Sequence, residues 1–208
     1  MNLHIFMAQL AAVFIFANPI PPLKGELLRR RQDLDTPEGY TVGPLHVVGD
    51  INGVPINHTG TIQEVYAQLD TEYNSFKLSA LDAIDSMSAF EEQHDKREMT
   101  DVNCWPVPGQ IYAEADGPAI IDGLKYLRKG DKTCNVGPQT CARVSCSWNS
   151  AIYVNKFPIA PSCKTIADFG RELNNKCRWQ RQAYEHHKVG GQAWDRGNWN
   201  VYIRKDKC

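Results

Sequence analysis

The sequence predicts an α+β fold: a two-layer α/β sandwich in which two helices cover an antiparallel sheet, stapled by disulfides and preceded by a largely helical propeptide. Three observations support this prediction. An apolar segment opens the chain, all seven cysteines lie after residue 103, and residues 98–208 alternate helix, strand hairpin, helix and strand hairpin. This order is typical of helices packed on one side of an antiparallel sheet.

Residues 1–17 have the composition of a secretory signal peptide. Only Gln9 interrupts the apolar run from Ile5 to Ala17, and Asn18-Pro19 follows it directly. The run is shorter than the roughly 20 apolar residues that a membrane-spanning helix needs. We therefore expect a secreted, extracellular protein. A buried N-terminal helix is the alternative interpretation.

Residues 18–97 are predicted to form an acidic, partly helical leader. Residues 1–97 hold 7 Lys and Arg against 13 Asp and Glu, whereas residues 98–208 hold 16 against 11. Turn-forming residues from Asp50 to Gly53 separate short apolar pieces, which indicates at most a small hairpin. Thr61 and Glu64 match the capping-box pattern, and apolar spacing extends a helix toward Glu92.

Two positions in the leader are candidates for modification or processing. Asn57-His58-Thr59 is an N-glycosylation sequon, so Asn57 is a predicted glycosylation site. Lys96-Arg97 lies in a charged stretch where a dibasic processing protease could cut, leaving residues 98–208 as the mature domain. The alternative is that Lys96 and Arg97 end the preceding helix, where cations are favourable.

The seven cysteines of the last region predict disulfides, since bridges persist in secreted proteins. A structural zinc site is the competing interpretation, but no pair has the C-x2-C spacing that such sites favour. We therefore expect no metal. One thiol must remain unpaired within the chain, and spacing alone does not choose the connectivity.

Local patterns place the elements of residues 98–208. A helix is predicted from an Asp116 cap to Gly130, and a second from Thr165 to Lys176, in which Gly170 indicates close packing against a neighbour. Strands are predicted over residues 142–148, 151–157, 192–194 and 199–204. Strand alternation would place Val144, Cys146 and Trp148 on one face.

The segment from Cys141 to Tyr153, the helix between Cys163 and Cys177, and the Trp194 and Trp199 strands up to Cys208 resemble fungal small secreted cysteine-rich proteins. They are also similar, more distantly, to the smut-fungus killer toxin family, an α/β sandwich. The resemblance covers about residues 104–208. It implies a secreted, effector-like or toxin-like protein and extends neither to the leader nor to its helix.

The killer-toxin resemblance further implies a bridge pattern: Cys104 with Cys177, Cys134 with Cys163, and Cys146 with Cys208. Cys141 is left unpaired, and relatives of the small secreted type hold a cysteine where this chain has Asn155, near Cys141 in the predicted hairpin. The resemblance also implies a functional basic residue at Arg143. Here Arg replaces Lys and Ser145 is an inserted residue, which puts a channel-blocking role in doubt.

No catalytic constellation emerges from the sequence, and we expect neither enzymatic activity nor a cofactor. The adjacent rings of His186 and His187 point apart, and no histidine is paired with Cys141 by any pattern. The carboxylates that could serve a glycosidase are each explained by a helix cap or a solvent face: Asp116, Asp122, Asp168, Glu172 and Glu185.

Binding is the predicted function. Basic residues at the end of the first helix (Lys125, Arg128, Lys129) and Arg143 could meet an anionic target, whereas a secreted protein rarely meets nucleic acid. We expect an effector or killer-toxin-like protein that binds a protein or membrane surface on a host or competitor cell. The alternative is a small cell-wall hydrolase or carbohydrate-binding protein, with Trp105, Trp179 and Trp194 as its platform.

Overall fold

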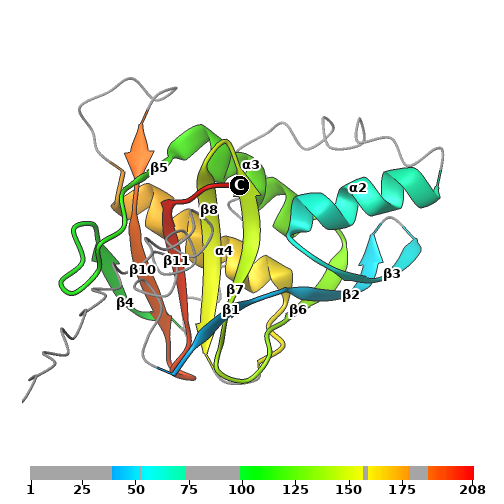
Figure 1. The fold of residues 1–208 in the computed structure, drawn as a ribbon, viewed down its shortest axis with the longest axis horizontal. Coiled ribbons are helices and arrows are strands. Elements are labelled where there is room, and N and C mark those ends of the chain that lie inside the picture. Colours follow the sequence, from blue (N-terminus) through cyan, green and yellow to red (C-terminus); the bar gives the residue numbers. More distant parts are fainter. Residues whose placement is uncertain (1–38, 52, 74–98, 157–158, 179–186) are drawn as a thin grey trace, which may run out of the picture.

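The computed structural model describes residues 39–51, 53–73, 99–156, 159–178 and 187–208. Within these ranges the protein has mixed α/β content, with three helices packed around a six-stranded sheet and three disulfides (Figure 1). The predicted signal peptide (residues 1–17), the end of the predicted leader helix, Lys96, Arg97 and Trp179 all lie outside the described residues.

The main sheet has the strand order β1-β7-β8-β11-β10-β4. Its strands are β1 (Thr41–Gly43), β4 (Met99–Cys104), β7 (Thr140–Ser147), β8 (Ser150–Lys156), β10 (Gly191–Asp195) and β11 (Asn200–Lys205). All neighbours are antiparallel except β1 and β7, which are parallel. The prediction of an antiparallel sheet is therefore confirmed for its four predicted strands, and β4 and β1 are additions, the latter from the predicted leader.

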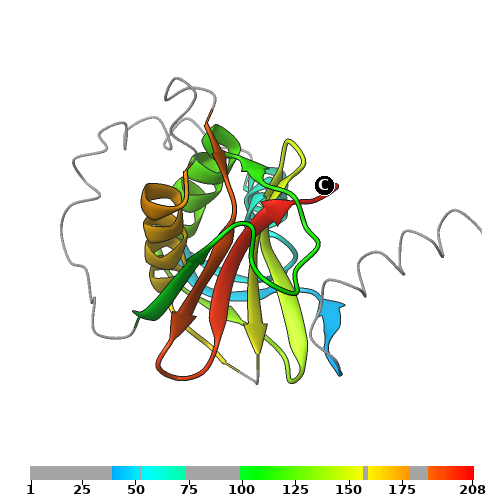
Figure 2. The same cartoon turned by 90° about the vertical axis from the view of Figure 1, so that its left-hand side faces the viewer.

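Two helices cover one face of this sheet, as Figure 2 shows. They are α3 (Gly117–Arg128) and α4 (Cys163–Lys176), close to the predicted ranges. Ser162 caps α4 by accepting a hydrogen bond from the Thr165 backbone N–H, 3.0 Å away. A Cβ on Gly170 would lie 2.5 Å from Leu124 Cδ2, so Gly170 allows the close α3–α4 packing that the sequence indicated.

The expected side-chain cap at Asp116 is not formed. Asp116 occupies the N-cap position of α3, but its side chain makes no capping hydrogen bond. Its carboxylate instead accepts a hydrogen bond from Lys188 Nζ, 2.9 Å away on β9 (Lys188–Val189), which pairs with β5 (Ala115–Asp116).

Residues 41–72 contribute a second, smaller sheet and the third helix. The strands β2 (His46–Ile51) and β3 (Val54–Thr59) form the predicted hairpin, and β2 also pairs with β6 (Asp131–Asn135). The helix α2 (Ile62–Glu72) begins at the predicted Thr61–Glu64 capping box. The sequence predicted that this helix continues toward Glu92. Residues 74–98, which hold that continuation, lie outside the described residues.

The hydrophobic core runs through both the predicted leader and the cysteine-rich region. Leu45, Ile62 and Leu69 are fully buried in the same cluster as Leu124 of α3 and Ile152 of β8. Tyr66 of α2 packs edge-on against Tyr126 of α3, with ring centroids 5.0 Å apart. The predicted boundary at residue 97 therefore does not coincide with a division of the core.

Three disulfides join the elements, and they are the three pairs that the resemblance implied. Cys104–Cys177 ties β4 to the end of α4, Cys134–Cys163 ties β6 to its start, and Cys146–Cys208 ties β7 to the C-terminal residues. Each bridge is expected to stabilise the fold by about 2–4 kcal/mol. Cys141 is buried and unpaired, also as the resemblance implied.

Candidate functional site: the β7–β8 hairpin end

A β-bulge shapes the end of the β7–β8 hairpin. Arg143 pairs with Tyr153, but the next pair is Ser145 with Ile152, so Val144 is an extra residue on β7. Val144 belongs to the core under the helices, whereas Cys146 packs with Ala151 and other residues on the opposite face of the sheet. The prediction that Val144, Cys146 and Trp148 share a face is therefore wrong, because the bulge reverses the alternation.

The turn of this hairpin presents an exposed tryptophan. Trp148 and Asn149 have φ angles of 50° and 56°, and the strands continue directly from Ser147 and Ser150. Two successive positive φ angles match the twist of a tight hairpin, and asparagine tolerates them well. A bulky side chain rarely adopts this conformation, yet Trp148 is 84 % exposed. Local packing of the indole does not account for this choice of residue.

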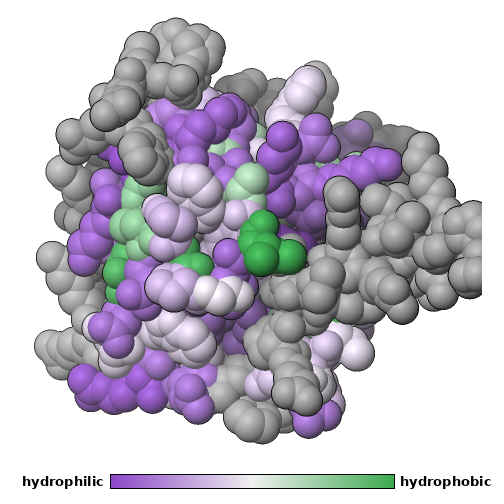
Figure 3. Space-filling view, turned by 60° about the vertical axis from the view of Figure 1, so that its left-hand side comes forward, coloured by the Kyte–Doolittle hydropathy of each residue, from purple (hydrophilic) through white to green (hydrophobic). Residues whose placement is uncertain are grey.

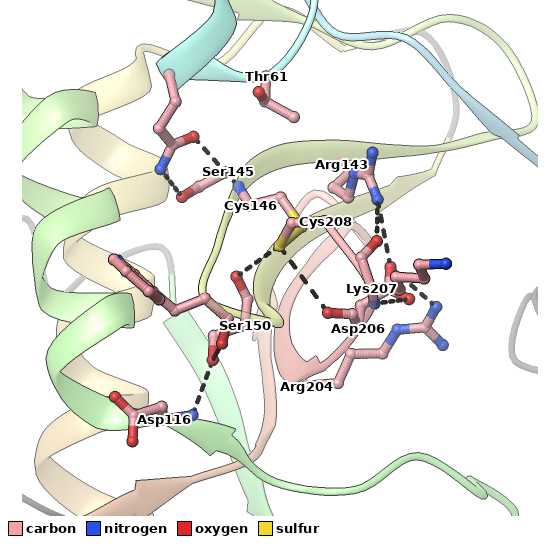
Figure 4. The surroundings of a disulfide bond; sticks show 12 residues. Thr61, Asp116, Arg143, Ser145, Cys146, Ser150, Arg204, Asp206, Lys207 and Cys208 are labelled. Carbon is pink, nitrogen blue, oxygen red and sulfur yellow. Dashed lines mark hydrogen bonds and ion pairs between the residues drawn. A yellow bond between two sulfur atoms is a disulfide. The ribbon is translucent and has the colours of Figure 1, made fainter.

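Three distant segments hold the hairpin end in place (Figure 4). The Gln63 side chain on α2 donates to Ser145 Oγ at 2.7 Å and accepts from the Cys146 backbone N–H at 3.2 Å. The Asp116 N–H donates to Ser150 Oγ at 2.9 Å, and the Asp206 N–H donates to the Asn149 carbonyl at 3.0 Å. The Cys146–Cys208 bridge adds a covalent tie. The turn that carries Trp148 is thus preorganised.

Arg143, the basic residue singled out by the resemblance, takes part in anchoring the C-terminal residues. Its Nη1 donates to the Lys207 carbonyl at 3.0 Å and lies 3.7 Å from the Asp206 carboxylate. Asp206 also accepts a hydrogen bond from Tyr153 Oη and lies 3.6 Å from Arg204 Nη2. Arg143 keeps only 28 % of its side chain exposed. Figure 4 shows Arg143, Arg204, Asp206 and Lys207 gathered on one side of the disulfide.

Beneath this group, Arg204 is buried against two aromatic rings. Its guanidinium carbon lies 4.8 Å from the Tyr153 ring centroid and 6.0 Å from that of Tyr202, and the two rings stack 4.9 Å apart. Burial, together with the hydrogen bond to Asp206, raises the pKa of Tyr153 to about 12. The phenol therefore stays protonated and works as a hydrogen-bond donor to Asp206.

The basic residues predicted on the first helix do not join Arg143. Lys125 Nζ lies 3.4 Å from Asp122, and Arg128 forms an ion pair with Asp168 of α4. Lys129 is 7 % exposed, and burial lowers the pKa of its amine. These residues lie on the helix-covered face of the sheet, whereas Arg143 packs beside Tyr153 on the other face. The structure therefore does not bring the four predicted binding residues together.

Two exposed cations near the hairpin end were not singled out from the sequence. Lys205 pairs across the sheet with Ser150, and Lys207 lies next to the Cys146–Cys208 bridge. Both are exposed, and among the described residues neither has a carboxylate partner. The register of β8 and β11 places Lys205 near this end, and the Asp206–Asn149 hydrogen bond with the Cys146–Cys208 bridge places Lys207 there, although both lysines are more than 55 residues from Trp148 in sequence.

Cys141 has the properties of a buried structural thiol. It lies between Asn155 on β8 and Val42 on β1 in the sheet register, which confirms the predicted proximity of Cys141 to Asn155. Burial raises its pKa to about 12, although Arg204 and Tyr202 lower it in part. A thiol that stays protonated at neutral pH is a poor nucleophile.

Of the tryptophans predicted as a carbohydrate platform, the two that the structure describes are not widely exposed. Trp105 and Trp194 are each partly buried, and Trp105 Nε1 donates to the Tyr112 carbonyl at 2.8 Å. Trp148, which the sequence placed on one strand face with Val144 and Cys146, is the tryptophan with a widely exposed ring in the described part of the chain. The feature of the sequence that could have indicated this exposure is the position of Trp148 beside Asn149, at the turn between the two strands.

The predicted glycosylation site, Asn57, lies on the smaller sheet. Asn57 is exposed on β3, an edge strand of the small sheet, and its Oδ1 lies 2.6 Å from His46 Nε2.

In the described ranges no three His, Cys, Asp or Glu side chains gather closely enough to hold a metal ion. No helix in those ranges is both long and apolar enough to cross a membrane.

Comparisons with models of protein families, with curated proteins and with solved structures found no match for this chain.

Proposed function

We propose that this protein is a secreted, non-catalytic binding protein of the effector or killer-toxin type, and that the β7–β8 hairpin end is its binding site. The observation that carries the proposal is Trp148: a tryptophan 84 % exposed, in a rare backbone conformation, on a turn tied down by a disulfide and by three segments. Tryptophan and arginine are the residues most enriched at the energetic centres of interfaces.

Preorganisation is what makes this turn suited to binding. An exposed side chain on a loose loop loses conformational entropy when it is ordered by a partner, and that loss weakens the complex. Here Gln63, the Asp206 N–H and the Cys146–Cys208 bridge already hold the turn. The indole of Trp148 can therefore be buried at little additional cost in backbone entropy.

The cysteine framework supports the toxin-like part of the proposal. The three bridges are those that the resemblance implies, and the bulge at Val144 gives the inserted residue a place without moving Cys146 away from Cys208. The oxidised cysteines are compatible with an extracellular protein. The buried, protonated thiol of Cys141 supports a role that does not depend on nucleophilic chemistry.

The test is binding of the labelled, oxidised protein to intact fungal and plant cells. Trp148→Ala is expected to lose at least tenfold in apparent affinity, while Tyr73→Ala, which removes an aromatic ring 42 % exposed at the end of α2, keeps wild-type binding. Far-UV circular dichroism and intact mass verify that both variants are folded and bridged. Equal binding by Trp148→Ala and the wild type would refute the hairpin end as the site.

A further inference from the structure

We infer that the surface recognised by the hairpin end is an anionic phospholipid bilayer, with the Trp148 ring in the headgroup region and Lys205 and Lys207 facing lipid phosphates. This inference rests on the proposed function and names the partner of the same site. Tryptophan favours the membrane–water interface because its ring is largely apolar and its N–H is polar.

A second exposed apolar side chain lies close to the same end of the molecule. Ile111 is 70 % exposed in the segment between β4 and β5. The Ala113 carbonyl in this segment accepts a hydrogen bond from the Lys205 N–H at 2.7 Å, and Lys205 pairs with Ser150 at the hairpin end. Ile111 and Trp148 are thus two exposed apolar side chains on segments that both contact Lys205 or its strand partner Ser150.

The balance of charge favours an anionic surface. On the helices, cations have nearby carboxylates: Lys125 with Asp122, Arg128 with Asp168, and Lys176 with Glu172. At the hairpin end, Lys205 and Lys207 have no such partner among the described residues. Among the carboxylates around this end, Asp206 binds Tyr153 and lies near two arginines, and Asp116 binds Lys188. Glu114, the residue after Ala113, is partly buried and carries a further carboxylate. The exposed side-chain charges without an ion-pair partner at this end, within the described residues, are those of Lys205 and Lys207.

The sparse apolar surface favours a lipid partner over a folded protein. A stable protein interface buries about 800 Å² on each partner around an apolar core. On the face drawn in Figure 3, apolar side chains instead form small groups separated by hydrophilic ones. The other large apolar side chains found exposed in the described ranges, Val42, Val48 and Tyr73, belong to β1, β2 and α2. Isolated protruding side chains beside cations suit a bilayer interface, which adapts to their shape.

The experiment is sedimentation of the full, oxidised chain with vesicles of phosphatidylcholine alone or mixed with phosphatidylserine, at low and high salt. We expect binding to the anionic vesicles and loss of it at high salt. Lys205→Ala and Lys207→Ala should each weaken binding about fivefold, equivalent to about 1 kcal/mol per lysine. Trp148→Ala should weaken it at least as much, whereas Lys125→Ala and Tyr73→Ala should bind like the wild type.

The outcomes separate this inference from the proposed function. If the protein ignores anionic vesicles while Trp148→Ala still abolishes binding to cells, the site stands and its partner is a protein or a glycan, which overturns the lipid inference. Equal binding to neutral and anionic vesicles overturns the role of Lys205 and Lys207. Anionic-vesicle binding that Trp148→Ala leaves unchanged overturns the assignment to the hairpin end.

Discussion

The side-chain oxygen of Gln63 accepts a hydrogen bond from the backbone N–H of Cys146, 3.2 Å away and 83 residues later in the chain. The same amide donates to Ser145 Oγ, so a residue of α2 satisfies two polar groups next to the bulge of β7. This relationship joins the segment that the sequence assigned to a leader to the hairpin end that carries Trp148.

Gln63→Ala is expected to lower the free energy of unfolding by about 1–3 kcal/mol, because it leaves the partly buried Cys146 N–H and Ser145 hydroxyl without this partner. The midpoint of urea unfolding measures the effect. Gln68→Ala is the matched control, since Gln68 Nε2 makes an exposed contact of 3.4 Å with the Thr59 carbonyl. Similar midpoints for the two variants would contradict the anchoring role of Gln63.

Cutting the purified chain at Lys96-Arg97 is expected to leave both pieces associated. β1 and β2 pair with β7 and β6, and Leu45, Ile62 and Leu69 are fully buried in the common core. No disulfide joins the pieces, because every cysteine follows residue 103. Size-exclusion chromatography after limited proteolysis should give one peak that separates only in denaturant. Release of residues 39–73 under native conditions would restore the leader as a removable propeptide.

Asn155→Cys is expected to form a fourth bridge with Cys141. The two residues are direct partners in an antiparallel pair, where Cα atoms lie about 4.5–5.5 Å apart, within the disulfide range. Closing a loop of about 15 residues adds about 3 kcal/mol in the chain-entropy model. Intact mass should drop by two further hydrogens, and the midpoint of thermal unfolding should rise. Asn155→Ser provides the control, and a free thiol count of two in folded Asn155→Cys would contradict the prediction.

Stability is expected to rise between about pH 7 and pH 8.5 through Lys132. Its side chain is buried, and burial lowers its pKa from 10.5 to about 7. In this interval the unfolded state binds more protons at Lys132 than the folded state, so raising the pH favours folding. Above this interval the Cys141 thiol and the Tyr153 phenol lower the stability as the pH rises. Their pKa values are raised to about 12 in the folded state, so there they bind more protons than in the unfolded state.

Urea unfolding of the wild type and of Lys132→Met across this interval measures the contribution. The difference in unfolding free energy between the two proteins should change with pH in the stated direction. A difference that stays constant from pH 7 to pH 8.5 would show that Lys132 remains charged in the fold, held by its hydrogen bonds to the carbonyls of Leu127 and Lys129.

Local patterns predicted most of the elements correctly. The Thr61–Glu64 capping box marks the start of α2, the Asp50–Gly53 turn joins β2 to β3, and the apolar spacing around Ile166 marks α4. These features depend on residues within a few positions of one another, so the sequence records them directly. The disulfide pairs came from the resemblance, because spacing alone left the connectivity open.

The candidate site was predicted much less well. Arg143 was predicted as a binding residue, but in the structure it donates to the Lys207 carbonyl and anchors the C-terminal residues. Trp148 was assigned to a strand face, because nothing local indicates that Val144 is an extra residue in the register. A bulge is defined by two strands together, and the exposure of a turn depends on which segments pack beneath it.

The sequence by itself determined the periodic apolar stripes, the caps and turns, and the supply of cysteines in the second half of the chain, since each arises from short-range chemistry. Only the tertiary structure decided that residues 41–72 share the core, that Gln63 holds Cys146, and that Lys205 pairs with Ser150 next to the turn that carries Trp148. The physical reason is that strand pairing joins segments far apart in the chain, such as Thr41 of β1 with Thr140 of β7, and their complementarity appears only when the chain folds.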